Sequence, residues 1–194
     1  MKFENNIIDE TISNILNIIS SGKFKDCESN LLELKDLSNG TQWKSLKETI
    51  CAFLNTNGGY IICGIRERNN TYQITGFDKN NESTIIELRT EFFKNDNGVL
   101  LNLSDNIFFT YKDVGKTLAI ISVLPLSEDL KFVKFNETYF ERVLSQDKII
   151  GIENLNQHRE YKVEIEYSKE ISTVINAKLI DLDVDKINQF IIRI

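Results

Sequence analysis

The sequence predicts an α+β fold, in which helices flank a mixed, largely antiparallel sheet. Two observations support this fold class. Segments whose apolar residues recur at helical spacing lie among short apolar runs of strand length, and several of those runs are joined by tight turns. With 194 residues, of which 41% are hydrophobic and 27% charged, the chain has the size and balance of one globular domain, or of one domain with an extension.

The first elements follow from apolar spacing and from residues that end helices. Helical spacing predicts an amphipathic helix over residues 8–19. A short strand is expected at 31–35, and then a helix at 41–55 with Thr41 as its N-cap. The glycines at 58–59 end that helix, because glycine adopts the left-handed conformation at a helix C-terminus.

The run at 60–65 is apolar on both faces and therefore predicts a central strand, with residues 72–75 as its hairpin partner. The remaining expected elements are, in chain order, a helix at 83–93, strands at 107–111 and 117–124, strands at 132–135 and 138–143, a helix at 147–156, a strand at 163–167 and a closing helix at 183–192. Short turns between the paired strands predict antiparallel hairpins.

Composition excludes several classes of protein. Three cysteines without C-x-x-C spacing argue against a disulfide framework, and with His158 as the single histidine they argue against a zinc site. The net charge of −6 argues against non-specific coating of nucleic acid. Residues 23–68 are nevertheless slightly basic, which leaves room for a local phosphate-binding face.

The chain is expected to lie in the cytoplasm and away from membranes. No apolar run approaches the ~20 residues that span a bilayer, and the first residues do not have the pattern of a signal peptide.

The candidate catalytic residues begin with Glu33 and Lys35. Alternate side chains on a strand share a face, so these two point the same way. Metal-dependent nucleases use such a pair: the carboxylate holds Mg²⁺ or Mn²⁺, and the lysine stabilises the attacking water or the phosphate charge. Glu28 lies five residues before Glu33, so the two carboxylates converge only if the chain bends at about Ser29-Asn30. We predict that bend.

Glu67 follows the central strand and completes a set of three acids with Glu28 and Glu33. Its neighbours Arg66 and Arg68 are candidate phosphate contacts. The predicted nucleic-acid-binding set also includes Lys44, Lys47 and Arg142. A second interpretation stays open, in which the Glu-x-Lys pair is a solvated ion pair worth under ~1 kcal/mol and the Gly-Gly turn is purely structural.

Six segments of the chain carry a family resemblance. They are E-S-N-L-L-E-L-K at 28–35, A-F-L-N-T-N-G-G at 52–59, Y-I-I-C-G-I-R-E at 60–67, I-T-G at 74–76, V-L-P at 123–125 and Y-F-E-R at 139–142. In this order and spacing they resemble the Schlafen AlbA_2 domain family. The sequence departs from the family pattern at two positions, because Glu67 replaces a more usual Asp and Arg66 replaces an acidic residue.

The resemblance implies a domain organisation. An N-terminal helix at 1–23 precedes a Schlafen AlbA_2-like domain at 24–145. A helix-strand-helix extension at 146–194 follows and is expected to pack on the same domain.

The resemblance also implies a function. Nuclease members of the family cleave tRNA and rRNA with a divalent metal held by three acids, which correspond to Glu28, Glu33 and Glu67. We therefore expect a metal-dependent endoribonuclease that acts on structured, tRNA-like RNA with Mg²⁺ or Mn²⁺ in antiviral or stress defence. Animal relatives embrace an RNA stem with two such lobes, which implies a homodimer here.

Two alternatives to the nuclease stay open. One is a non-catalytic nucleic-acid-binding or regulatory domain of a transcriptional-regulator-type protein. The other is an oligomerisation or small-ligand module.

Overall fold

The computed structural model describes residues 5–38, 40, 42–128 and 130–172. The chain divides after Gly151 into two compact units. The first unit combines helices with mixed sheets, which confirms the predicted α+β class. The described part of the second unit is helix α4 (Ile152–Ser172). Among the described helices, none is long and apolar enough to cross a membrane.

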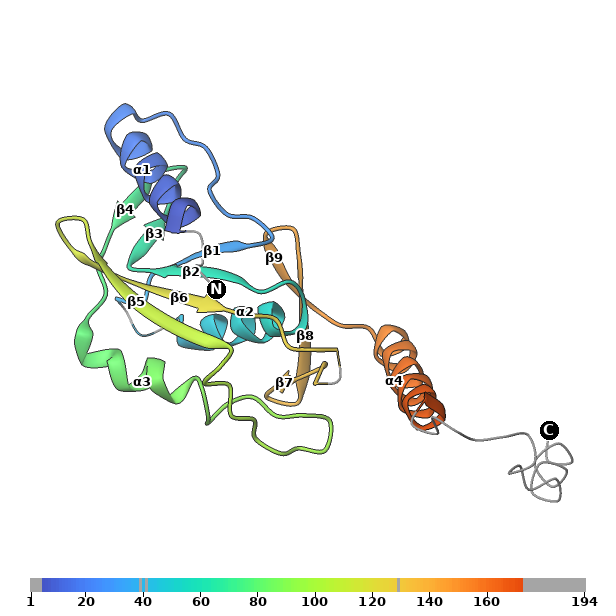
Figure 1. Cartoon of the computed structure of the whole chain (residues 1–194). Coiled ribbons are helices and arrows are strands. Elements are labelled where there is room, and N and C mark those ends of the chain that lie inside the picture. Colours follow the sequence, from blue (N-terminus) through green and yellow to red (C-terminus); the bar gives the residue numbers. More distant parts are fainter. Residues whose placement is uncertain (1–4, 39, 41, 129, 173–194) are drawn as a thin grey trace, which may run out of the picture. The chain divides into compact units, whose positions relative to one another are not determined.

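The main sheet has four strands in the order β1-β2-β6-β5 (Figure 1). Their bounds are Leu32–Lys35 for β1, Gly59–Cys63 for β2, Ile107–Asp113 for β5 and Thr117–Val123 for β6. β1 pairs in parallel with β2, whereas β2 with β6 and β5 with β6 are antiparallel. The sheet is therefore mixed and largely antiparallel, as the sequence predicts.

Two helices cover opposite faces of this sheet (Figure 1). Helix α1 (Asn5–Ser21) buries four of its isoleucines in a cluster with Ile62, while α2 (Trp43–Asn55) packs against Ile61 and Cys63. The four are Ile8, Ile12, Ile15 and Ile18. Neighbouring residues of β2 thus face different helices, because side chains alternate along a strand. This arrangement explains why the strand is apolar on both faces.

Helix α2 begins later than the sequence predicts. Gln42 takes the N-cap position but makes no side-chain capping hydrogen bond. Thr41, the predicted cap, lies outside the described residues. The cap motif in the sequence therefore identified the helix but not its first residue.

The predicted central strand is interrupted at Gly64, whose φ of +107° is rarely adopted by residues other than glycine. β3 (Ile65–Glu67) starts on the other side of this glycine and pairs with β4 (Tyr72–Ile74) in a separate sheet. The hairpin partner of β4 is therefore β3 and not the central strand.

Strands β7 (Lys134–Phe135), β8 (Thr138–Val143) and β9 (Gln146–Ile149) form a third sheet. Asn55 joins this sheet to α2, because its buried side chain accepts a hydrogen bond from the amide of Val133 at 2.8 Å and donates to the carbonyl of Phe140 at 2.9 Å. The asparagine of the A-F-L-N-T-N-G-G segment therefore has a structural role that the sequence did not indicate.

Three predicted elements are corrected. The helix expected at 147–156 begins as strand β9, because residues there pair with β8. The strand expected at 163–167 lies inside α4. The helix expected at 83–93 is shorter: a 3₁₀ turn, η1 (Lys79–Asn81), leads into α3 (Glu82–Glu87).

The closing helix expected at 183–192 lies outside the described residues. That the extension packs on the first domain stays a prediction.

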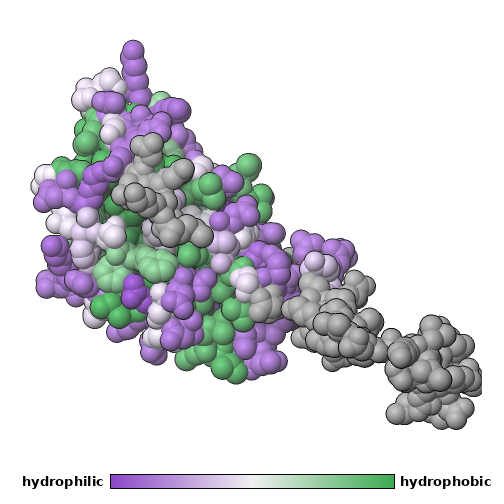
Figure 2. All heavy atoms as spheres, in the orientation of Figure 1, coloured by the Kyte–Doolittle hydropathy of each residue, from purple (hydrophilic) through white to green (hydrophobic). Residues whose placement is uncertain are grey.

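The surface of the first unit is of mixed polarity. On the face that Figure 2 shows, hydrophilic and hydrophobic residues are interspersed. Exposed apolar side chains such as Phe108, at 40% exposure, are normal when they are scattered among polar ones. We assign no function to them.

Candidate functional site

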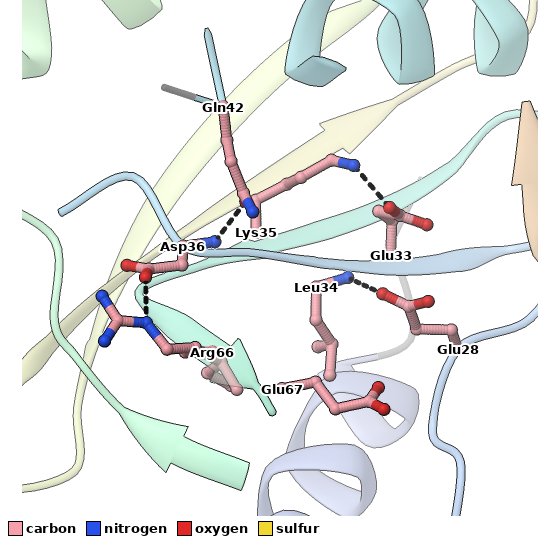
Figure 3. A pocket seen from close by; sticks show the side chains of 9 residues that line it. Glu28, Glu33, Leu34, Lys35, Asp36, Gln42, Arg66 and Glu67 are labelled. Carbon is pink, nitrogen blue, oxygen red and sulfur yellow. Dashed lines mark hydrogen bonds and ion pairs between the residues drawn. The ribbon is translucent and has the colours of Figure 1, made fainter. Parts of the chain in front are cut away.

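A pocket of about 230 Å³ lies beside strands β1 and β3 (Figure 3). Its lining residues are Glu28, Glu33, Leu34, Lys35, Asp36, Gln42, Ile65, Arg66 and Glu67. The fold therefore brings all three predicted acids and two of the predicted cations to one cavity.

Glu28 reaches the pocket because the chain folds back before β1. The amide of Ser29 donates a hydrogen bond to the carbonyl of Leu32 at 3.0 Å, which closes a turn at the predicted position. Glu28 Oε1 then accepts a hydrogen bond from the amide of Leu34 at 3.1 Å. The turn thus brings the side chain of Glu28 beside β1, the strand that carries Glu33.

Glu33 is held by two cations. Lys35 Nζ lies 2.5 Å from Glu33 Oε1, and Arg142 Nη2 lies 2.6 Å from Glu33 Oε2. Only 9% of the Glu33 side chain, 8% of Lys35 and 1% of Arg142 is exposed. The interpretation of Glu-x-Lys as a solvated ion pair is therefore wrong, because this network is buried. Lys35 also donates to Ser45 Oγ at 2.9 Å.

Glu28 and Glu67 have unusual acidities. Burial, and then the charge of Glu33, raise the pKa of Glu28 from 4.5 to about 7. Partial burial raises the pKa of Glu67, with Asp26 adding to the effect. A carboxyl group whose pKa lies near neutrality can both accept and donate a proton under physiological conditions. Perturbed acids of this kind in a pocket favour a functional site.

Asp36 is a pocket residue that the sequence analysis missed. Arg66 Nε lies 2.5 Å from its Oδ2, and Thr75 Oγ1 donates to its Oδ1 at 2.9 Å. Although desolvation opposes the change, hydrogen bonds from Ser38, Arg66 and Thr75 lower the pKa of Asp36 to about 2. Asp36 directly follows the E-L-K segment, and that position is the signal that could have identified it.

Arg142 corrects another expectation. We expected it to contact nucleic acid, but its guanidinium is buried and fully engaged: besides Glu33, Nη1 lies 2.8 Å from Asp147 Oδ1. The other oxygen of Asp147 accepts a hydrogen bond from Thr49 Oγ1 at 2.5 Å. A phosphate at the surface cannot reach a side chain placed in this way, so Arg142 belongs to the support of the site.

The other predicted nucleic-acid contacts lie outside the pocket lining. Lys44 and Arg68 are exposed, and Lys44 pairs with Glu48 one helical turn away at 3.6 Å. Lys47 lies over the ring of Phe92, 3.4 Å from its centroid, and burial lowers its pKa. Of the predicted cations, only Lys35 and Arg66 line the pocket.

The hydrogen bond between Thr49 and Asp147 makes a testable contribution to stability. Thr49→Val keeps the shape of the side chain and removes this charge-assisted bond, so we expect a loss of about 1.5 kcal/mol in unfolding free energy. Urea unfolding monitored by circular dichroism measures it. The matched change Thr110→Val, at an exposed position of β5, should stay within about 0.5 kcal/mol of the parent. Equal effects of the two changes would contradict the prediction.

The pocket offers carboxylates as possible ligands for a divalent cation. Among the described residues, no group of three or more His, Cys, Asp or Glu side chains is placed to hold a metal ion together. Mg²⁺, however, is usually bound by only one or two carboxylates, with water and substrate phosphates completing its octahedron. Glu28 and Glu33 line the same pocket and so supply the number of carboxylates that Mg²⁺ usually takes, although Glu33 is already shared with two cations.

Comparisons with known proteins agree with the motif pattern. A sequence model of the family described as "Schlafen, AlbA_2" matches residues 28–151, a range that contains every residue lining the pocket. A search of curated proteins gives no match.

Two solved structures are similar to this chain. The DIP2311 protein from Corynebacterium diphtheriae is 19% identical with a TM-score of 0.47, over 75% of this chain and 30% of that one. The N-terminal domain of a protein from Nitrosomonas europaea, named as related to the ATP-dependent DNA helicase RecG, is 22% identical with a TM-score of 0.46. That match covers 78% of this chain and 95% of that one. The chain thus spans about 30% of the length of the first of these proteins.

Proposed function

The chain belongs to the Schlafen AlbA_2 family, and from this membership we propose that it is a metal-dependent endoribonuclease acting on structured, tRNA-like RNA. The observation that supports this proposal is the composition of one pocket. It combines Glu28, whose pKa is raised to about 7, with the lysine and arginine that line the same cavity. Acids for proton transfer and cations for phosphate are what hydrolysis of a phosphodiester requires.

The pocket residues have distinct roles in this proposal. Glu28, whose pKa lies near neutrality in the metal-free pocket, would be ionised beside a bound cation and would then accept a hydrogen bond from the attacking water. Lys35, fixed by Glu33 and Ser45, stabilises the negative charge that develops on the phosphate. Arg66, with 32% of its side chain exposed, contacts a neighbouring phosphate and so orients the strand.

In this proposal Glu28 and Glu33 hold Mg²⁺ or Mn²⁺, with Glu67 at the edge of the same pocket. When bound, the cation supplies charge neutralisation and activation of water. The environment of Glu28 favours such a partner: desolvation and the charge of Glu33 both disfavour its ionised form, and a nearby cation offsets both effects.

We propose further that two copies act together on one RNA in the cytoplasm, in antiviral or stress defence. A single lobe of this size contacts one side of an RNA stem, and a symmetric dimer offers a second, identical surface.

A second function, a non-catalytic nucleic-acid-binding or regulatory domain, is favoured by one specific observation. The charges of the site are already compensated within the protein: Glu33 by Lys35 and Arg142, and Arg66 by Asp36. In that case the ion pairs stabilise the fold, and exposed residues such as Arg68 contact nucleic acid.

The two functions are separated by incubating the purified protein with total tRNA, with Mn²⁺ or with EDTA. We expect discrete fragments with Mn²⁺, none with EDTA, and a loss of at least about 100-fold in rate for Glu28→Gln. Glu10→Gln, at an exposed position of α1, should cleave as the parent does.

Three other results have definite meanings. Intact tRNA that is bound equally by the parent and by Glu28→Gln in EDTA would establish the binding domain. Intact tRNA that is not bound would instead support the oligomerisation or small-ligand module. Equal cleavage by both proteins would place the activity outside this pocket.

A further inference from the structure

Arg142 connects the third sheet to the candidate site. It lies on β8 and reaches the edge of the main sheet, where β1 begins. Its donors contact four acceptors there: the carbonyl of Ser29 at 3.0 Å from Nη2 and 3.3 Å from Nε, the carbonyl of Leu32 at 3.3 Å, Glu33 Oε2 at 2.6 Å and Asp147 Oδ1 at 2.8 Å. One planar group thus binds both the turn before β1 and a side chain on β1.

Two of the acceptors of Arg142 connect it to the two acids of the site: the carbonyl of Ser29, next to Glu28, and the carboxylate of Glu33. Ser29 follows Glu28 and closes the turn that folds it back, and Glu33 is itself the second acid. We propose that Arg142 is a positioning residue, which fixes Glu28 and Glu33 relative to each other by holding the Ser29 turn and the Glu33 carboxylate in one guanidinium. The inference concerns the pocket of the proposed function and rests on that function only for the importance of the two acids.

The guanidinium is itself held in place from the other side. Asp147 on β9 binds its Nη1, and Thr49 on α2 binds Asp147. The ring of Phe53, also on α2, lies 5.3 Å from the guanidinium carbon, a distance at which a cation is attracted to an aromatic face. The third sheet and α2 therefore hold Arg142 in a fixed position. This small sheet thus supports the candidate site as well as the core.

A simpler role would be that of a buried counter-ion for Glu33. Geometry distinguishes the two roles, because a guanidinium carries five donors in a rigid fork whereas an ammonium is a point charge. Lysine at this position would keep the charge but could not bind the Ser29 carbonyl, Glu33 and Asp147 together. Arg142→Lys therefore keeps the positive charge and removes the positioning contacts, so this variant distinguishes the two roles.

The amide of Leu34 offers a direct measurement, since it donates its hydrogen bond to Glu28 Oε1. Its hydrogen exchange, measured by NMR on the full chain, reports whether Glu28 is in place. In Arg142→Lys we expect the Leu34 amide to exchange about ten-fold faster relative to the core amide of Ile62. A general loss of stability would accelerate both amides equally, and that result would overturn the proposal.

Ser45→Ala is the matched control, because it removes a contact of the same ion network without touching the Ser29 turn. It should leave the ratio of Leu34 to Ile62 exchange unchanged, and a ten-fold change would contradict the proposal. If Arg142→Lys does not fold, Asp147→Asn weakens the second anchor of Arg142. A rise in the same ratio then supports the positioning role, and an unchanged ratio overturns it. None of these measurements uses RNA cleavage, so this inference and the proposed function can fail separately.

Discussion

Replacing Glu33 with alanine should lower the unfolding free energy of the protein by about 3–5 kcal/mol, the usual result of removing one member of a buried ion network. Lys35 and Arg142 would both lose their shared carboxylate while remaining buried. Bulk solvent compensates the guanidinium poorly, since 1% of the Arg142 side chain is exposed in the parent. Urea unfolding at pH 7 in EDTA measures the effect on the metal-free protein.

Two comparisons make this result specific. Glu10→Ala, an exposed carboxylate on α1, should stay within about 0.5 kcal/mol of the parent. Glu33→Ala combined with Lys35→Met should cost less than the sum of the two single changes, because the second change removes a charge that the first left unpaired. A loss below about 1 kcal/mol for Glu33→Ala would mean that the network is solvated and would contradict the prediction.

The expected instability of Glu33→Ala has a consequence for tests of function. An inactive Glu33 variant would not distinguish a lost catalytic group from a loosened fold. Glu28 makes a single hydrogen bond to a backbone amide, and glutamine offers an amide oxygen for the same bond. Glu28→Gln is therefore the better probe of catalysis.

The strand positions of the main sheet and the meeting of Glu28, Glu33 and Lys35 were predictable from the sequence, because local geometry decides them. Alternation along a strand puts Glu33 and Lys35 on one face, and their ion pair confirms it. The bend between Glu28 and Glu33 followed from their odd separation, and the turn at Ser29 confirms it.

The sequence could not predict which residues far apart in the chain contact each other. Arg142 lies 109 residues after Glu33, and no periodicity indicates that the two meet. Residues 163–167 were assigned wrongly for the same reason. V-E-I-E-Y alternates as a strand does, but it lies within α4. A strand needs a neighbour for its backbone hydrogen bonds, whereas a helix satisfies them internally. Residues 146–149 did find a neighbour, β8, and became a strand instead of a helix.

Glu28→Gln should make the protein more stable at pH 8, by about 2 kcal/mol, although it removes a group that we assign to catalysis. The pKa of Glu28 rises from 4.5 to about 7 on folding, so between these values the folded state binds more protons than the unfolded state. Linkage then requires that the stability contributed by this residue falls as the pH rises from about 4.5 to about 7. The magnitude allows for screening of a partly exposed carboxyl group by solvent.

The sign of this effect distinguishes a functional acid from a structural one. Urea unfolding of the parent and of Glu28→Gln in EDTA should give equal stabilities near pH 4 and a growing advantage of the variant up to pH 8, whereas Glu10→Gln should follow the parent throughout. A variant that is less stable at every pH would show that the Glu28 carboxylate serves mainly to accept the Leu34 amide. Residues that a fold would be more stable without are typical of functional sites, because selection for activity keeps them in place. The expected outcome would therefore give a reason, independent of any cleavage assay, to regard Glu28 as a residue maintained for function.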